Sequence, residues 1–231
     1  MRLVLISDTH GMLDQLELPE GDLLVHAGDV SAHGAMKELV KFDQDLAAIR
    51  ARYTHGVVFC VGNHDFAFEH HPVEAQACIT NAVYLQDREV TVGGLRIYGA
   101  PWQPRFRDWA FNLDRGTQLQ GKWQQIPAGL DILITHGPPL GHGDRVTDPQ
   151  PAPWRIPATD PRSVGCADLA REVLQKQPRV HVFGHIHEDY GMWETATTLY
   201  VNASTCNRAY RPINPPVVLD FGLVQSTVLR S

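Results

Sequence analysis

Five short apolar segments of this 231-residue chain end in glycine-containing turns that carry aspartate, histidine or asparagine. The turns are Ser7-Asp8-Thr9-His10-Gly11, Gly28-Asp29, Gly62-Asn63-His64-Asp65, Thr135-His136-Gly137 and Gly184-His185-Ile186-His187. In an α/β sheet, ligands bind in the crevice beyond the carboxyl ends of the strands, and glycine lets the backbone approach a ligand closely. The repeated pattern therefore predicts that the five turns meet at one site.

The segments around these turns predict a layered α/β fold with mixed sheets. Apolar runs rich in β-branched residues predict strands at Arg2–Ile6, Leu23–His26, Val57–Val61, Asp131–Thr135, Val180–Phe183 and Leu199–Asn202. Two hairpins are expected, one joining Glu89–Val92 to Leu95–Tyr98 through Gly93-Gly94 and one joining Val217–Phe221 to Val224–Leu229. Helices are expected at Met36–Ile49, Pro72–Ile79, Gln118–Ile126 and Ala167–Gln177. No domain boundary is visible, so we expect one domain over residues 1–231.

The side chains in the turns are those that bind metal ions. Asp8 and His10 are two residues apart, as are His185 and His187, and such pairs point to the same side of an extended segment. A mixture of carboxylate, imidazole and amide ligands suits manganese, iron or zinc better than calcium or magnesium. The candidate ligands are Asp8, His10, Asp29, Asn63, His136, His185 and His187. They are too many for one tetrahedral ion, and they fit a pair of ions about 3.5–4 Å apart, the arrangement used for phosphoryl displacement.

Taken together, these motifs resemble those of the calcineurin-like metallophosphoesterases and occur in the same order. The resemblance extends from residue 2 to about residue 205. Further matches to one branch, the metallophosphoesterase-domain proteins that are class III cyclic nucleotide phosphodiesterase-like, are Tyr84–Asp87, Ile97–Trp102, Thr135–Pro139 and Asn202–Cys206. Some members of that branch lack the histidine found here at His185, so its presence implies a complete two-metal site. The fold implied is a four-layer α/β/β/α sandwich with mixed sheets.

The resemblance also implies a role for each motif residue. One ion is expected on Asp8, His10 and His187, a second on Asn63, His136 and His185, and a bridge between them at Asp29. His64 is expected to be catalytic, stabilising or protonating the leaving oxygen. Asp65 is expected to hydrogen-bond His64 and hold its orientation.

The predicted activity is metal-dependent hydrolysis of small phosphodiesters, through a dinuclear metal centre and metal-bound hydroxide. Cyclic nucleotides are candidate substrates, and phosphomonoesters are a further option. Manganese is the first choice of metal, with iron and zinc as alternatives. Two other functions fit the same motifs: a nuclease, and a non-catalytic nucleotide-binding sensor or scaffold. The net charge of −6 argues against long nucleic acid as a partner, because phosphate contacts need clustered lysine and arginine.

The sequence also supports predictions for several regions outside the motifs. The proline- and glycine-rich segment Gly137–Ser163 is expected to border the site. His26 and His181 are expected to be buried in strands, and core packing is the default expectation for Trp109. No apolar stretch approaches the ~20 residues of a membrane span, and the four cysteines lie far apart, so a cytoplasmic protein with free thiols is expected. The sequence does not indicate an oligomeric state.

Overall fold

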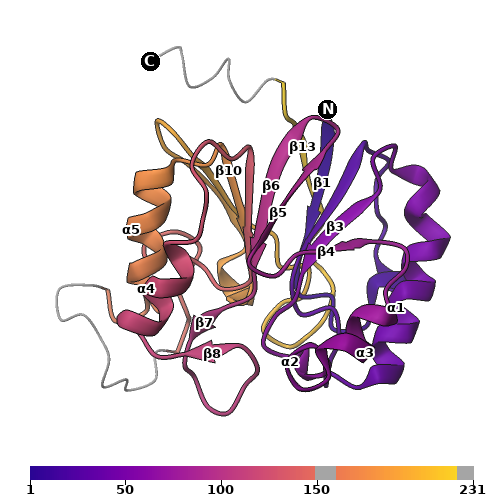
Figure 1. Cartoon of the computed structure of the whole chain (residues 1–231), viewed down its shortest axis with the longest axis horizontal. Coiled ribbons are helices and arrows are strands. Elements are labelled where there is room, and N and C mark those ends of the chain that lie inside the picture. The colour runs from indigo at the N-terminus through magenta and orange to yellow at the C-terminus, as the bar shows by residue number, and fades with distance from the viewer. Residues whose placement is uncertain (149–159, 223–231) are drawn as a thin grey trace.

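A computed structural model describes residues 1–148 and 160–222, which form four layers (Figure 1). Two sheets pack face to face in the middle of the molecule, and helices cover the outer face of each sheet. This arrangement confirms the predicted α/β/β/α sandwich. None of the helices in these residues combines the length and the apolar character needed to cross a bilayer.

Among the described residues, the first sheet has five strands in the order β13-β1-β2-β3-β4. Their bounds are β1 Arg2–Ile6, β2 Leu23–Ala27, β3 Val57–Cys60, β4 Val83–Tyr84 and β13 Val217–Asp220. Strands β1 to β4 are parallel, and β13 runs antiparallel beside β1. The side chains of β2 and β3 are buried throughout, which is why these strands are continuous apolar runs in the sequence.

The second sheet has six strands in the order β11-β12-β10-β9-β6-β5. Their bounds are β5 Arg88–Val92, β6 Leu95–Ala100, β9 Ile132–Thr135, β10 Val180–Phe183, β11 Gly191–Glu194 and β12 Leu199–Asn202. The four central strands are parallel, and the two edge strands are antiparallel to their neighbours. Two short strands, β7 (Gln103–Pro104) and β8 (Asn112–Leu113), pair beside the sandwich.

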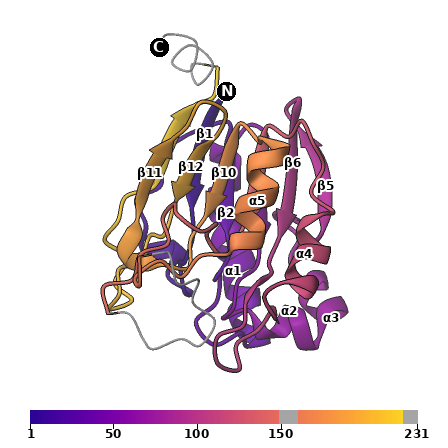
Figure 2. The same cartoon turned by 90° about the vertical axis from the view of Figure 1, so that its left-hand side faces the viewer.

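In the part of the chain that the structure describes, five α-helices form the outer layers. They are α1 Met36–Ile49, α2 Phe66–His70, α3 Pro72–Ala77, α4 Thr117–Trp123 and α5 Ala167–Lys176. Helix α1 buries Leu39, Phe42 and Leu46 against the first sheet, at the spacing of one helical face. Figure 2 shows α5 lying against the second sheet, where Leu169 and Val173 pack. Residues 1–148 and 160–222 also contain three single-turn 3₁₀ helices: η1 Leu13–Gln15, η2 Arg50–Arg52 and η3 His187–Asp189.

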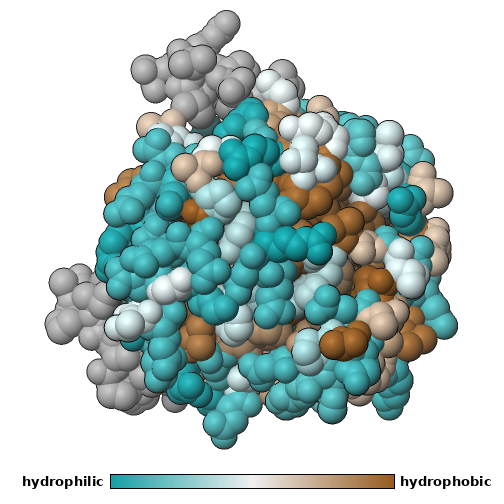
Figure 3. All heavy atoms as spheres, viewed as in Figure 1, coloured by the Kyte–Doolittle hydropathy of each residue, from teal (hydrophilic) through white to brown (hydrophobic). Residues whose placement is uncertain are grey.

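The apolar interior is divided by the layers. One core lies between the two sheets and includes Leu5, Val25, Ile134 and Val182. The other two lie between each sheet and its helices. The face shown in Figure 3 is mostly hydrophilic, with smaller apolar areas between the polar ones.

The structure differs from the sequence prediction in a few short elements. Helix α2 was not predicted, because five residues are too few to show a helical period. Strand β13 pairs with β1, and Val224–Leu229, its predicted hairpin partner, lies outside the described residues. His26 and His181 are buried in strands and the four cysteines are free, as expected.

Candidate metal centre

The five predicted turns meet where the two sheets face each other. Each turn follows the carboxyl end of a parallel strand: β1, β2 and β3 in the first sheet, and β9 and β10 in the second. The turns after β9 and β10 contribute His136, His185 and His187, and the other three contribute the two aspartates, His10 and Asn63. Because both sheets present the same ends at this seam, all seven predicted ligands come together.

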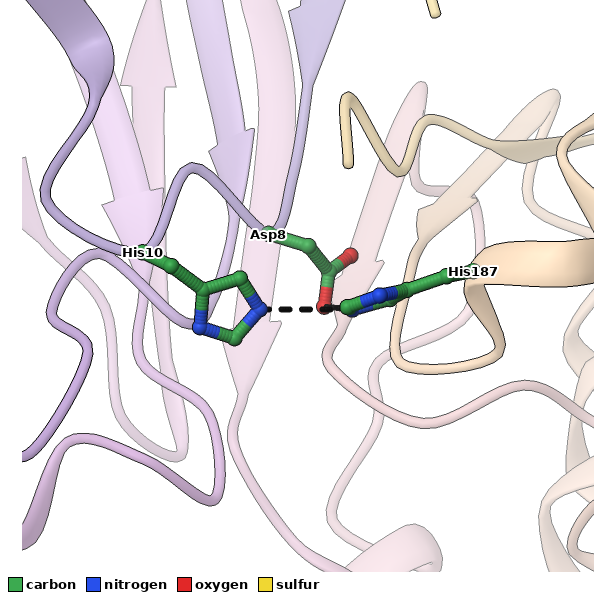
Figure 4. Close-up of side chains that lie close together, drawn as sticks. All are labelled: Asp8, His10 and His187. Atoms are coloured by element: carbon green, nitrogen blue, oxygen red, sulfur yellow. Dashed lines mark hydrogen bonds and ion pairs between the residues drawn. The ribbon is translucent and has the colours of Figure 1, made fainter. Parts of the chain in front are cut away.

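Asp8, His10 and His187 form one group (Figure 4). The His187 Nε2 atom lies 3.2 Å from Oδ1 of Asp8 and 3.3 Å from Nε2 of His10. On its other side, the His187 ring donates from Nδ1 to the carbonyl oxygen of Asn207 at 3.0 Å. Such a bond fixes the ring and leaves Nε2 with its lone pair toward the group, as in many metal sites.

Asn63, His136 and His185 form a second group. The Asn63 Oδ1 atom lies 3.0 Å from His136 Nε2 and 2.7 Å from His185 Nδ1. His136 donates from Nδ1 to the carbonyl oxygen of Ala27 at 3.0 Å, so its Nε2 also faces the group.

Asp29 lies between the two groups. One carboxylate oxygen is 3.4 Å from His136 Nε2, and the other is 3.8 Å from His10 Nε2. A carboxylate in this position can contact an ion in each group.

The donor set fits metal ions. Since His187 and His136 use Nδ1–H for carbonyl oxygens, their Nε2 atoms face the carboxylates of Asp8 and Asp29, and in a neutral ring each Nε2 presents a lone pair. Two acceptors that face each other repel unless a proton or a cation lies between them. Both carboxylates are almost completely buried, which increases that cost. A pair of divalent cations would satisfy these atoms.

The pKa values of the candidate ligands also fit a metal site. Burial raises the pKa of Asp8, but the neighbouring imidazoles, first that of His187, outweigh burial and hold the pKa well below its ordinary range. The pKa of Asp29 is lowered by the same competition, with His136 as its main partner. Burial lowers the pKa of His136, yet the adjacent Asp29 raises it to about 9. Burial lowers the pKa of His185 to about 3. The carboxylates are therefore ionised, and at His136 a metal ion would take the place of the proton that Asp29 holds there.

Four of the predicted ligands have left-handed backbone conformations. The φ angles are 54° for Asp8, 45° for His10, 55° for Asp29 and 69° for His185. Non-glycine residues rarely adopt this conformation, and it is concentrated at functional sites. Gly62 and Gly184 pack directly on the ligands, and a Cβ atom there would overlap the carboxylates of Asp29 and Asp8 respectively.

His64 lies over the two groups. Its Nε2 atom is 4.0 Å from the Asp29 carboxylate, and its ring packs edge-on against His10 at a centroid distance of 4.6 Å. Asp65 does not hydrogen-bond the His64 ring, so the predicted contact between them was wrong. The His64 ring donates from Nδ1 to the carbonyl oxygen of Ala32 at 2.7 Å.

The Asp65 carboxylate bonds to the backbone of two turns. It accepts hydrogen bonds from the backbone of Val30, Ser31 and Gly62 and from the Ser31 hydroxyl. These bonds tie the turn after β3 to the turn after β2. Asp65 therefore holds two ligand-bearing turns together.

The site opens into a cleft of about 380 Å³. Gly137, Pro138, Val146 and Asp148 line it, so the described part of Gly137–Ser163 borders the site as predicted. The stretch 149–159 lies outside the described residues. The sequence analysis missed Arg115, Arg208 and Tyr210, which also line the cleft. Tyr210 follows shortly after the Asn202–Cys206 motif, and this proximity was the available signal.

This fold, with ligand turns at the seam of two sheets, is that of a metallophosphoesterase. Residues 1–189 match the family model for calcineurin-like phosphoesterases, and the chain belongs to that family. The resemblance predicted from the motifs is therefore confirmed.

Sequence similarity to known proteins supports the same family assignment. The chain is 44% identical to metallophosphoesterase domain-containing protein 1 of Homo sapiens, over 95% of this chain and 71% of that protein. It is 38% identical to UPF0046 protein T07D4.2 of Caenorhabditis elegans, over 96% of this chain and 60% of that protein. One crystal structure aligns with a TM-score of 0.56 at 16% identity, covering 87% of this chain and 89% of the other. That likeness concerns the fold alone.

Proposed function

We propose that this protein is a metal-dependent phosphodiesterase that hydrolyses small phosphodiesters at a dinuclear centre. The observation that carries the proposal is the convergence of seven ligand-type side chains, four of which line a small cleft. Membership of the calcineurin-like phosphoesterase family supports hydrolysis of phosphoester bonds. The preference for diesters, with cyclic nucleotides among the candidates, goes beyond the family assignment.

In this proposal, Asp8, His10 and His187 hold one ion, and Asn63, His136 and His185 hold the other. Asp29 contacts both ions. Manganese suits the mixed ligands best, with iron or zinc as alternatives. When bound, the ions would activate water and neutralise charge on the phosphoryl oxygens.

His64 would act on the leaving group. Its Nδ1 is committed to the carbonyl oxygen of Ala32, so Nε2 is the atom that can face the substrate. In its protonated form, Nε2–H can donate to the departing oxygen, as a general acid does. Asp65 acts at a distance, by holding the turn that carries His64.

The cleft favours a small substrate. Its volume of about 380 Å³ is within the range of pockets that bind small ligands. The net charge of −6 is unfavourable for a long polyanion. The nuclease is the second candidate because four arginines of the described residues line the cleft: Arg105, Arg107, Arg115 and Arg208.

A substrate panel tests the proposal. Metal-reconstituted protein should be assayed on cyclic nucleotides, phosphomonoesters and a single-stranded DNA oligonucleotide, with the Asp29→Asn variant as the control for contaminating activity. We expect the highest kcat/KM on a small diester. Faster cleavage of the oligonucleotide would favour the nuclease. Nucleotide binding without turnover of any ester would favour the sensor.

A further inference from the structure

We propose that Tyr210 and Trp109 form a binding subsite for a planar aromatic group on the leaving-group side of the substrate. The inference rests on the proposed function, because it takes His64 as the residue that faces the leaving oxygen. It adds a property that the metal centre does not have, namely recognition of the organic part of the phosphoester.

The position of His64 defines where the leaving group must lie. A group that receives a proton from His64 Nε2 must be within hydrogen-bond reach of that ring. Trp109 stacks on the same ring, with a centroid distance of 4.3 Å and a tilt of 32°. Tyr210 lies 6.0 Å from it on a different loop. An alcohol departing beside His64 would therefore lie close to these two aromatic side chains.

Tyr210 also covers the first ligand group. Its ring packs edge-on against His10 at 4.8 Å and against His187 at 5.2 Å. Nevertheless, about half of the residue (49%) is exposed, and it lines the cleft. Among the described residues, neither Tyr210 nor Trp109 belongs to any of the three apolar cores. The expectation that Trp109 serves core packing was therefore wrong.

Both aromatic residues lie on loops that are hydrogen-bonded to predicted metal ligands. The Asn207 carbonyl that accepts from His187 also accepts from the backbone N–H of Tyr210, at 2.8 Å. On the other side of the cleft, the Ala110 backbone donates to the carbonyl of Asn63 at 3.2 Å, directly after Trp109. The loop that carries Tyr210 is therefore linked to His187 through Asn207, and the loop that carries Trp109 is bonded directly to Asn63.

The loop that carries Tyr210 is held by several bonds. The Asn207 side chain accepts from the backbone of Ala209 and Arg211, and Tyr210 has a φ of 55°. A tyrosine rarely adopts the left-handed region, so the surrounding bonds must maintain it. A preformed apolar surface costs little entropy when a ligand binds.

The ligand chemistry follows from the pair of rings. A flat aromatic group has the apolar faces that Tyr and Trp rings stack on, whereas an aliphatic alcohol lacks them. Nucleobases and simple aryl groups share this chemistry. The subsite thus selects phosphoesters by an aromatic group on or near the leaving alcohol.

Binding of two phosphonates tests the subsite without turnover. Phenylphosphonate and methylphosphonate carry the same anionic group, and neither contains an ester bond to hydrolyse. Titration calorimetry on the metal-loaded protein should show phenylphosphonate binding at least about 10-fold more tightly, the effect of one stacked ring. Tyr210→Leu and Trp109→Leu should each reduce this ratio to about 3-fold or less, and Tyr210→Phe should preserve it. The control is Ile213→Ala, an exposed residue of the same segment outside the cleft lining. Equal affinities in the unmodified protein, or a ratio that both leucine variants leave intact, would overturn the proposal.

A pair of cyclic esters distinguishes the source of the aromatic group. Adenosine 3′,5′-cyclic phosphate and the corresponding methyl riboside phosphate have the same reacting ring and differ in the base. A higher kcat/KM for the adenosine ester, lost in Tyr210→Leu through KM, identifies a nucleobase. Equal kcat/KM values, combined with tight phenylphosphonate binding, identify a smaller aryl group. Failure to hydrolyse either ester would exclude cyclic nucleotides as substrates, while the phosphonate measurement would still decide on the subsite.

Discussion

The Nε2 atom of His187 lies 3.2 Å from Oδ1 of Asp8, although the two residues are 179 positions apart and follow strands of different sheets. The candidate metal centre therefore exists only when the two sheets are packed together. Ions that bind both halves would favour the folded chain over the unfolded one. Metal binding and stability should be linked in this protein.

The Asp29 carboxylate should contribute to the binding of both ions. Its two oxygens face His136 and His10, which belong to different ligand groups. We expect Asp29→Ala to reduce the binding of both ions, and His185→Ala to weaken mainly one. Metal analysis after dialysis measures this directly. Two tightly bound ions in Asp29→Ala would rule out its bridging role.

Replacement of His64 should lower the rate of hydrolysis without reducing the metal content. Its Nδ1 bonds the carbonyl of Ala32, and its Nε2 is free to act on the substrate. His64→Ala should keep the metal content and lose roughly 10²–10⁴-fold in rate on a diester with a poor leaving group. A nitrophenyl ester, whose leaving group needs no proton, should lose less. Equal losses on both esters would point to charge stabilisation in place of proton donation.

Glu38 gives a pH-dependent contribution to stability. Its carboxylate accepts from the backbone N–H groups of Ala35, Ala32 and His33 at the start of α1. Burial raises the pKa of Glu38, but these bonds outweigh burial and lower it below the ordinary 4.5. Because the folded state favours the ionised form, the stabilisation is present above pH 4.5 and is lost as the pH falls through the folded pKa.

The Glu38→Ala variant tests this contribution. At pH 7 it should lower the free energy of unfolding by about 1 kcal/mol, the usual worth of a helix cap. Urea unfolding of both proteins at several pH values should show the difference shrinking below pH 4.5. A difference that stays constant down to pH 3 would contradict the ionised cap.

Two glycine-to-alanine variants test how closely the backbone packs on the ligands. A Cβ atom at Gly184 would overlap the Asp8 carboxylate and the Ser7 hydroxyl, whereas at Gly121, within α4, it would meet open space. Gly184→Ala should destabilise the protein by about 1–3 kcal/mol and weaken metal binding. Gly121→Ala should stabilise it by about 0.5–1 kcal/mol. Thermal unfolding and metal content, compared for the pair, provide the check, and wild-type metal affinity in Gly184→Ala would be inconsistent with this packing.

The sequence predicted those parts of the structure that depend on local patterns. The bounds of β1 and α1 match the prediction, because an uninterrupted apolar run and a helical period are visible in the sequence itself. The convergence of the five turns was predictable because parallel strands present their carboxyl ends together.

Other features depend on contacts between distant residues. The carboxylate of Asp65 bonds to residues 30, 31 and 62, and only the last of these is near it in sequence. Tyr210 reaches the site through a left-handed backbone conformation, for which a tyrosine gives no signal comparable to glycine. Its place at the metal centre depends on the bond between Asn207 and His187, which joins segments on different sides of β11 and β12.

A manganese titration of the metal-free protein tests the central claim most directly. Bound metal and the hydrolysis rate of a small phosphodiester should be measured on the same samples. The account predicts that the rate rises with metal content and reaches its maximum at about two ions per chain. Full hydrolysis after exhaustive chelation, with metal analysis confirming removal, would contradict it.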